Sequence, residues 1–270
     1  MSLTLASWNI NSVRARAGLV AGWMDRHPDC ALLGLQEIKC TESQFPTTFA
    51  QSGHRTAVKG QKAYNGVAIL GRQDMVVVQD HLAAFVDSTT QDGSPAARYL
   101  EVESAGIHMA SLYVPNGNSG GEAGLATKLS FLEALAARAK ALLDKHVPFA
   151  LMGDFNICPT PLDHAPGTLA PEDALLLPSV QAAYRRLANL GLTDAYRALH
   201  PQEAGYTFWD YQGGARKRGA GLRIDMALLS PRLADRLESA EVDAKQRDTT
   251  LGGEKPEKPS DHAPLVVKLR

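Results

Sequence analysis

Polar side chains that could hold a metal ion or move a proton recur in this sequence where apolar runs end. In chain order they are Asn9, Asn11, Glu37, Tyr113, Asn116, Asp154, Asn156, Asp225, Asp261 and His262. Asp154 and Asn156 are two residues apart, so in an extended backbone both side chains point to one face. Asn9 and Asn11 have the same spacing. Because chain ends at one edge of a sheet meet in space, and loops there carry chemistry, these residues predict one site.

A few carboxylates among neutral amides form a ligand set that suits Mg²⁺, with Mn²⁺ as a possible substitute. Mg²⁺ prefers hard oxygen ligands, keeps several waters, and usually takes one or two protein carboxylates plus phosphate oxygens of the substrate. An Asp–His pair near such an ion could hold an imidazole protonated or oriented against a phosphate oxygen. Together these groups could carry out a metal-assisted attack of water on phosphorus.

Each of these residues also has an ordinary structural explanation. Glu37 after an apolar run could be a solvated strand end, and Tyr113 could belong to the core. The segment GDFN could be a turn, in which Asp and Asn are favoured for local hydrogen bonding. The segment PSDHAP could be a loop punctuated by proline. Only the whole set, taken together, favours a catalytic site.

The elements that must position these residues are predicted from periodicity. Short apolar or alternating runs bounded by Gly, Pro, Asn or Asp indicate strands over 3–8, 30–35, 66–70, 75–78, 98–103, 106–114, 148–153, 222–229 and 263–269. Apolar residues at helical spacing predict helices over 16–26, 125–145 and 179–190. No segment marks a linker or a repeat. We therefore expect a single α+β domain over residues 1–270, with two packed sheets and outer helices.

Composition limits the possible partners and compartment. No run approaches the roughly 20 apolar residues that a membrane span needs, and the N-terminus does not read as a secretory signal. Three cysteines without CxxC spacing argue against a disulfide framework and favour the cytoplasm. The net charge of −1 gives no global support for binding a polyanion, so positive charge must be local. The candidates are Arg14 and Arg16, and Arg216-Lys217-Arg218 with Arg223, although such runs also occur as solvated loops.

Nine segments, taken in order, resemble the exonuclease III family of apurinic/apyrimidinic endonucleases. They are SWNINSVRAR, GLQEIK, YNGVAIL, SLYVPNG, MGDFNICP, LGLTDAYR, YTFWDY, LRIDMALLS and PSDHAPL, and they run from about residue 3 to the C-terminus. GDFN and SDH are shared with the wider superfamily, which includes deoxyribonuclease I, inositol phosphatases and sphingomyelinases. WNINSVRAR with LQEIK, and YTFWDY before LRIDM, narrow the resemblance to the DNA-repair branch. The implied fold is the four-layer α/β/β/α sandwich of deoxyribonuclease I, in which two packed mixed sheets are flanked by helices.

The resemblance also implies a chemical role for each matched residue. Glu37 would be the principal metal ligand with Asn9 beside it, and Asp154 would orient or deprotonate the attacking water. Asn156 would hydrogen-bond that water or the phosphate, and Asp225 would pair with His262, whose imidazole faces the scissile phosphate. Tyr113 would reach the phosphate as a hydrogen-bond donor or as a phenolate. The residues expected around the metal are Glu37, Asn9, Asp154, Asn156, Asp261 and His262.

The implied partner is duplex DNA with abasic sites or blocked 3′ ends, bound by a monomer. The predicted DNA contacts are Asn11, Arg14, Asn116, Phe208, Trp209, Leu222, Arg223 and Ile224. Among them Phe208, Leu222 and Ile224 would line a pocket for an extruded abasic sugar. An abasic site is easier to extrude because no base pair or stack is lost there.

The sequence is compatible with three functions. The first is an abasic-site endonuclease with 3′-phosphatase, 3′-phosphodiesterase and 3′→5′ exonuclease activity. The second is a phosphatase or phosphodiesterase of the same superfamily that acts on a small molecule or lipid; YTFWDY and the basic residues around Arg216 argue against it. The third is a DNA-binding pseudoenzyme, which the presence of every expected polar residue argues against.

Three loops do not follow the usual family sequence and bear on substrate preference, namely 87–97, 115–122 and 158–178. His164 lies in the last of them, directly after Asp163. We hypothesise that His164 narrows the pocket, against the alternative of a solvated loop residue. His164→Ala should then change the rate of abasic-site cleavage, and an unchanged rate would count against the hypothesis.

Overall fold

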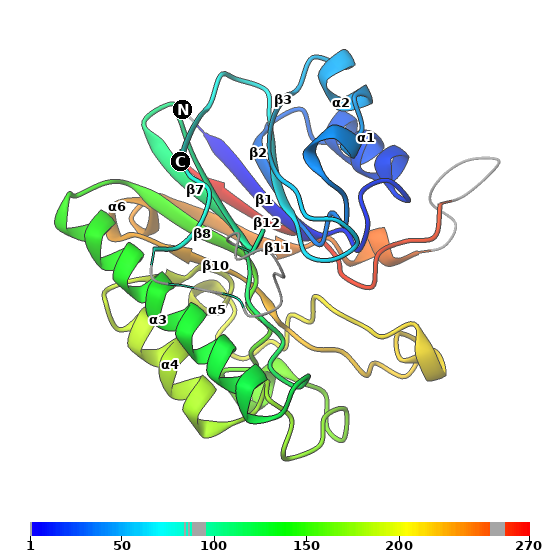
Figure 1. Cartoon of the computed structure of the whole chain (residues 1–270), viewed down its shortest axis with the longest axis vertical. Coiled ribbons are helices and arrows are strands. Elements are labelled where there is room, and N and C mark those ends of the chain that lie inside the picture. Colours follow the sequence, from blue (N-terminus) through cyan, green and yellow to red (C-terminus); the bar gives the residue numbers. More distant parts are fainter. Residues whose placement is uncertain (1, 84, 86, 88–95, 249–256) are drawn as a thin grey trace.

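Two sheets packed face to face form the centre of the structure, and helices cover both outer faces (Figure 1). The computed structural model describes residues 2–83, 85, 87, 96–248 and 257–270, and each sheet has six strands among them. Both sheets are mixed, because each contains one parallel pair of strands among antiparallel ones. The predicted four-layer α/β/β/α sandwich is therefore confirmed. Among the described residues, no helix has both the length and the apolar character to cross a membrane.

The first sheet has the strand order β11-β12-β1-β2-β4-β3. Its strands are β1 (Leu3–Asn9), β2 (Cys30–Gln36), β3 (Arg55–Lys59), β4 (Val67–Gly71), β11 (Leu237–Val242) and β12 (Leu265–Leu269). The second sheet has the order β5-β6-β7-β8-β10-β9. Its strands are β5 (Val76–Gln79), β6 (Tyr99–Ser104), β7 (Ile107–Tyr113), β8 (Phe149–Asp154), β9 (Thr193–Asp194) and β10 (Asp225–Leu229).

The helices cover the two sheets on opposite sides of the sandwich. They are α1 (Ala17–Arg26), α2 (Thr48–Gln51), α3 (Glu122–Asp144), α4 (Pro178–Ala188), α5 (Ala195–Leu199) and α6 (Pro231–Ala234). The chain also forms the short 3₁₀ helices η1 (Glu42–Gln44), η2 (Pro161–Asp163), η3 (Gln212–Gly214) and η4 (Ala244–Arg247). In Figure 1, α1 and α2 lie over the first sheet, and α3 and α4 lie together over the second.

Side chains alternate along the strands between the layer shared by the two sheets and the layers under the helices. In β1, Leu5 packs between the sheets, whereas Trp8 packs under α1 against Trp23. In β8, Met152 faces the other sheet, whereas Leu151 packs under α3. This period of two is the pattern that predicted the strands. Burying each large apolar side chain stabilises the fold by about 1.5–3 kcal/mol.

The nine predicted strands and three predicted helices are present, but short or polar elements were not predicted from the sequence. Strands β3 and β11 are edge strands whose exposed positions carry charged or polar residues, so they form no apolar run. Strand β9 has two residues, and α2, α5 and α6 have four or five. The strand predicted over 222–229 begins at Asp225, because Leu222 instead makes isolated bridges to His164 and Phe208.

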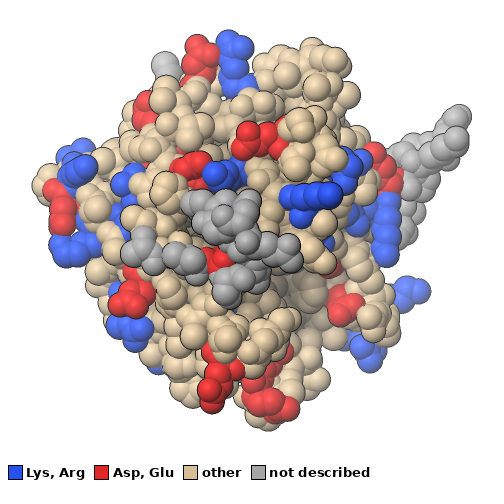
Figure 2. All heavy atoms as spheres, viewed as in Figure 1, with Lys and Arg blue, Asp and Glu red and all other residues tan. Residues whose placement is uncertain are grey.

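One face of the molecule shows how its charged side chains are distributed. On the face shown in Figure 2, basic and acidic side chains are interspersed around the molecule. This distribution agrees with a formal net charge of −1. Any attraction for a polyanion must therefore come from individual basic side chains close to the site.

Candidate active site

Sheet topology brings the predicted polar residues to one edge of the sandwich. The parallel pairs β1/β2 and β7/β8 place their carboxyl ends together, and these ends carry Asn9, Glu37, Tyr113 and Asp154. Strand β10 runs antiparallel to β8 and begins there, with Asp225 directly opposite Asp154. Strand β12 runs antiparallel to β1, so the segment before it delivers His262 to the same edge.

A close approach between two strands supports this edge. Gly153 precedes Asp154, and a Cβ at this position would lie 2.0 Å from the carbonyl oxygen of Leu112. Only glycine therefore allows β7 and β8 to run this close to each other just before the site. The two sheets are also joined here, because Gln36 Nε2 donates to Ser7 Oγ at 3.1 Å and to Ser111 Oγ at 2.9 Å.

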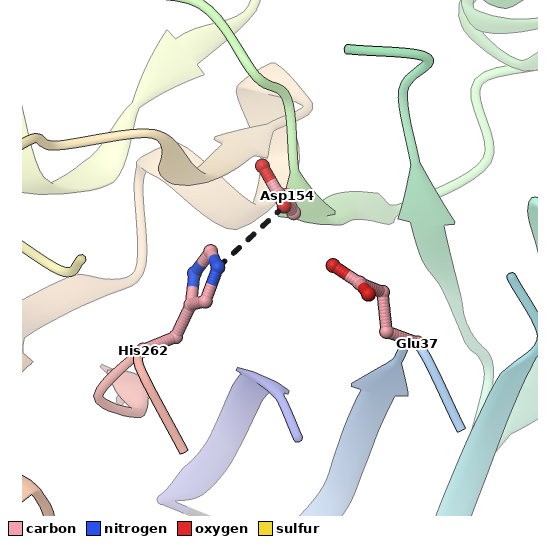
Figure 3. Close-up of side chains that lie close together, drawn as sticks. All are labelled: Glu37, Asp154 and His262. Carbon is pink, nitrogen blue, oxygen red and sulfur yellow. Dashed lines mark ion pairs between the residues drawn. The ribbon is translucent and has the colours of Figure 1, made fainter. Parts of the chain in front are cut away.

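Three titratable side chains form a possible metal centre. Glu37, Asp154 and His262 each offer one ligand atom, and these atoms lie within 4.8 Å of one another. Figure 3 shows the three side chains pointing toward one another from separate elements, with His262 Nε2 3.9 Å from Asp154 Oδ2. They come from stretches of chain more than a hundred residues apart, so only the tertiary fold assembles them.

Asn9 links the two carboxylates. Its Nδ2 donates to Glu37 Oε1 at 2.9 Å and to Asp154 Oδ2 at 3.0 Å, while its Oδ1 accepts from the backbone N–H of Asn11 at 3.1 Å. The predicted proximity of Asn9 to Glu37 is therefore confirmed. The Asn9 amide therefore holds the two metal-ligand candidates close together.

Lys39 belongs to the site and was not among the predicted residues. Its Nζ lies 2.8 Å from Glu37 Oε2 and donates to Asn11 Oδ1 at 2.5 Å. Burial opposes ionisation of Glu37, but Lys39 and Asn9 outweigh it and lower the pKa of this carboxyl. Glu37 and Lys39 both have positive φ, at 49° and 52°. The available signal was a lysine two residues after Glu37 in LQEIK.

His262 is held by a buried carboxylate. Its Nδ1 lies 2.8 Å from Asp225 Oδ2, and both side chains are nearly inaccessible to solvent, so the predicted pairing is confirmed. Burial would lower the pKa of His262, but Asp225 outweighs it, with Asp154 and Asp261 adding, and the pKa is raised to about 10. A protonated imidazole has no lone pair for a metal. This arrangement favours His262 as a hydrogen-bond donor rather than as the predicted metal ligand.

Asp154 lies at the centre of the site. Burial, together with the negative charges of Asp225 and Glu37, raises the pKa of Asp154 to about 7, and His262 opposes this rise. Its Oδ1 accepts from the backbone N–H of Asn156 at 2.9 Å. A carboxyl whose pKa is close to neutral can take a proton from water and release it again.

Asn156 is engaged on both sides of its amide. Its Oδ1 accepts from Asn116 Nδ2 at 3.1 Å, and its Nδ2 donates to the carbonyl of Val114 at 3.0 Å. Buried Lys128 lies beneath both asparagines and donates to the carbonyl of Asn116 at 2.8 Å and to that of Asn156 at 2.5 Å. The structure thus brings together the predicted residues Asn116 and Asn156, with Asn116 at the more open side.

The surroundings of Tyr113 bear on the two forms considered for it. Burial and the nearby carboxylates of Glu37 and Asp154 raise the pKa of Tyr113 well above its ordinary value. Arg98 stacks over the ring, 4.9 Å from its centroid, but does not reverse this effect. We therefore favour a neutral phenol that donates a hydrogen bond over a phenolate.

Buried arginines brace the loops around the site. Arg16 donates to the carbonyls of Ile10, Asn11 and Lys258, and Arg247 donates to those of Ser260 and Trp209. Arg16 was a candidate for surface positive charge, but its guanidinium holds the Asn9–Asn11 turn against the segment that carries His262. Asp261 lies in that segment, and its carboxylate accepts from Asn11 Nδ2 at 3.1 Å. Arg14 is exposed nearby.

Two of the predicted pocket residues, Phe208 and Leu222, lie on a groove beside His262 whose lining is both polar and apolar. The Phe208 ring packs edge-on against the His262 ring with centroids 4.9 Å apart. The groove has a volume of about 760 Å³, and residues 165–169 also line it. Ile224 packs behind Leu222 in an apolar cluster rather than facing the groove.

Two of the predicted DNA contacts are corrected. Arg223 is 1% exposed, and its guanidinium pairs with Asp163 and Asp194, so it has no open path to a phosphate. Trp209 is 6% exposed and is covered by Arg216, which lies 4.5 Å from the ring centroid.

The half-buried His164 forms a backbone bridge to Leu222, behind the groove wall. Of the predicted loop 87–97, residues 88–95 lie outside the described residues.

The donor set fits a hard divalent cation. Carboxylates of Glu37, Asp154, Asp225 and Asp261 gather here, and the cationic side chains in direct contact with them include Lys39 at Glu37 and His262 at Asp225. Burial and the negative charges of Asp225 and Glu37 raise the pKa of Asp154, and a divalent cation next to Glu37 would offset these charges. Oxygen ligands of this kind are those that Mg²⁺ and Mn²⁺ prefer.

Comparison with known proteins agrees with this geometry. A model of the endonuclease/exonuclease/phosphatase family matches residues 6–262. The chain belongs to this family. It is 32% identical to exodeoxyribonuclease III of Haemophilus influenzae over 274 aligned positions, which cover 98% of each chain.

Two solved structures of this family resemble the chain over nearly its whole length. One is the 3′ phosphatase NExo from Neisseria bound to a product DNA hairpin, with a TM-score of 0.86, 30% identity and 99% coverage of both chains. The other is an AP endonuclease from Archaeoglobus fulgidus, with a TM-score of 0.83, 32% identity and 98% coverage of both chains. The resemblance to the exonuclease III family noted in the sequence is therefore confirmed.

The Asp225–His262 pair generates a prediction about pH. Because the folded-state pKa of His262 is raised, the pair stabilises the fold below the ordinary histidine pKa, and this contribution is lost as pH rises through about 10. Asp225→Asn should lower the pKa of His262 markedly, toward its ordinary value of about 6.5. NMR titration of the imidazole signals would measure the shift. Asp210→Asn, at an exposed carboxylate, is the control, and an unchanged His262 pKa in Asp225→Asn would contradict the assignment.

Proposed function

We propose that this chain is a Mg²⁺-dependent phosphodiesterase of DNA repair, with Mn²⁺ as a possible substitute. It cleaves the backbone of duplex DNA on the 5′ side of an abasic site, and the same site removes 3′ phosphates, other 3′ blocking groups and 3′ nucleotides. The observation that carries this proposal is the gathering of Glu37, Asp154 and His262 at one edge, beside the groove of Phe208 and Leu222. The names of the relatives, exodeoxyribonuclease III and AP endonuclease, support it.

The metal would be held chiefly by Glu37, with Asn9, Asp154 and Asp261 close by. When bound, it would polarise a phosphate oxygen and offset the negative charge that develops on it. Asp154, whose pKa is about 7, is suited to orient a water and accept its proton. The Asn116–Asn156 pair borders Asp154 and could hydrogen-bond the phosphate or the water.

Two donors face the position of the phosphate from other sides. The imidazolium of His262, held by Asp225, presents its Nε2–H toward Asp154 and the space between them. The phenol of Tyr113 remains protonated and can donate from the end of β7. Donors that are already oriented toward a developing negative charge lower the barrier without reorganisation.

The groove beside His262 would receive the sugar on the 3′ side of the scissile phosphate. Its volume of about 760 Å³ falls within the range of ligand pockets. Phe208 and Leu222 supply apolar contact, which suits a sugar without its base. An abasic nucleotide enters such a groove at lower cost than a paired one, because it loses no stacking or pairing.

We also infer a monomer working in a reducing compartment such as the cytoplasm. The three cysteines, Cys30, Cys40 and Cys158, are buried and free, which supports a reducing compartment.

One assay separates this function from its main alternative. Purified protein is incubated, with and without Mg²⁺, with a duplex that carries one central abasic analogue and with the same duplex carrying a nick or recessed 3′ end. A small phosphomonoester and a lipid phosphodiester are tested in parallel. We expect Mg²⁺-dependent cleavage of the duplexes and much slower turnover of the small substrates. Efficient turnover of a small substrate with intact duplexes would contradict the proposal, and binding of abasic duplex without cleavage would indicate a pseudoenzyme.

Glu37→Ala tests the metal ligand. Removing the principal carboxylate should weaken Mg²⁺ binding and slow cleavage by orders of magnitude, on the order of 10²-fold or more. Isothermal titration with Mg²⁺ and cleavage rates over a range of Mg²⁺ concentrations would measure both effects. Glu42→Ala removes an exposed carboxylate five residues away and should leave both unchanged. A Glu37→Ala protein with wild-type Mg²⁺ dependence would refute this role.

A further inference from the structure

A buried network of ion pairs lies behind the apolar wall of the groove. Arg223 Nε lies 2.6 Å from Asp163 Oδ1, and Arg223 Nη1 lies 2.9 Å from Asp194 Oδ2. Arg197 Nη2 contacts the same oxygen of Asp163 at 2.8 Å. The hydroxyl of Tyr184 donates to Asp194 at 2.9 Å. The network therefore ties η2, α4, β9 and α5 to the segment just before β10.

Arg223 lies between Leu222, which lines the groove, and Ile224, which packs behind it. Leu222 and Ile224 flank it in the sequence and pack together in an apolar cluster with Cys158 and Leu175. In extended backbone, alternate side chains point to opposite faces, so Arg223 points away from this cluster while its neighbours form it. The position of the Arg223 guanidinium thus determines how Leu222 is presented to the groove.

The same arginine also contacts the segment that leads into lining residues 165–169. The backbone N–H of Arg223 donates to the carbonyl of Asp163 at 2.7 Å, and His164 bridges to Leu222. Asp163 is itself capped by Thr160, whose N–H and hydroxyl both donate to Oδ2 at 2.7 Å. The residues that follow Asp163, from Ala165 to Leu169, line the groove. The Arg223–Asp163 ion pair therefore connects Leu222 with residues 165–169, and both of these segments line the groove.

The chemistry of the pair makes this anchor rigid. A guanidinium is planar and presents N–H groups in a fixed fork, so Arg223 can hold Asp163 and Asp194 at the same time. A lysine would keep the charge but present a single point, and could not hold both carboxylates in this geometry. Neither Asp163 nor Arg223 is exposed to solvent, so neither is available to substrate.

We propose that Arg223 and Asp163 are positioning residues that set the width of the groove and thereby the choice between substrates. This inference rests on the proposed function. Substrates that place a sugar in the groove, namely an internal abasic site or a 3′-terminal nucleotide, depend on this ion pair. Removal of a terminal 3′ phosphate places no sugar in the groove, so it does not depend on the pair.

The test compares two substrates in two variants. Arg223→Lys and Asp163→Asn are assayed for kcat and KM on a duplex with a central abasic analogue and on a nicked duplex with a 3′ phosphate. We expect kcat/KM on the abasic duplex to fall roughly tenfold or more in both variants, because a small misplacement of a bound group is costly. On the 3′-phosphate duplex we expect a change within about twofold. If the wild type does not cleave the abasic duplex, release of a recessed 3′ nucleotide replaces it.

Controls separate positioning from general loss of structure. Arg138→Lys weakens another paired arginine, which contacts buried Glu101 at 2.7 and 2.8 Å on the second sheet, and should leave the ratio of the two activities unchanged. Thermal unfolding is measured for all variants. If Arg223→Lys fails to fold, Asp163→Asn still tests the inference, because it keeps the shape of the side chain. An equal loss on both substrates, or no loss on either, would overturn the inference. A wild-type protein inactive on every duplex would instead defeat the proposed function, and the inference with it.

Discussion

Mutual repulsion between buried carboxylates is the constraint on which the site depends. Glu37 and Asp154 approach each other closely enough to share one amide donor, Asn9. Asp225 lies directly opposite Asp154 on the neighbouring strand. Burial, with the negative charges of Asp225 and Glu37 adding to it, raises the pKa of Asp154 to about 7. Lys39 and protonated His262 offset part of this repulsion. The remaining negative charge would attract a divalent cation, and the bound cation would in turn attract a phosphate.

The sandwich supplies the rigidity that this arrangement requires. Each ligand candidate sits at the end of a strand or just beyond it, where hydrogen-bonded neighbours fix its direction. The loops between these strands are held by buried cations that donate to backbone carbonyls, as Arg16, Arg247 and Lys128 do. Positive charge in this chain thus serves the architecture of the site as well as any contact with DNA. A chain of net charge −1 therefore uses several of its cations to hold the loops around the site.

Much of the fold could be predicted from the sequence, because its central strands alternate apolar side chains and end in Asn, Asp or Glu. The edge strands β3 and β11 could not, since residues facing solvent on one side form no apolar run. The site residues were predicted from segments such as LQEIK and PSDHAPL, and their gathering at one edge depends on strand order, which periodicity does not determine. Arg223 shows the limit most clearly. A basic residue beside pocket residues reads as a DNA contact, but its direction depends on Asp163 and Asp194, which are distant in sequence.

The central claim is that residues from distant segments bind one divalent cation at the strand ends, and a crystal soaked in Mn²⁺ tests it most directly. Anomalous scattering identifies the ion without reference to activity. We predict one strong anomalous peak in contact with the Glu37 carboxylate and adjacent to Asp154, with His262 facing the same cleft. A peak at a different surface, or wild-type crystals in which Glu37 stays paired with Lys39 at saturating Mn²⁺, would contradict the account.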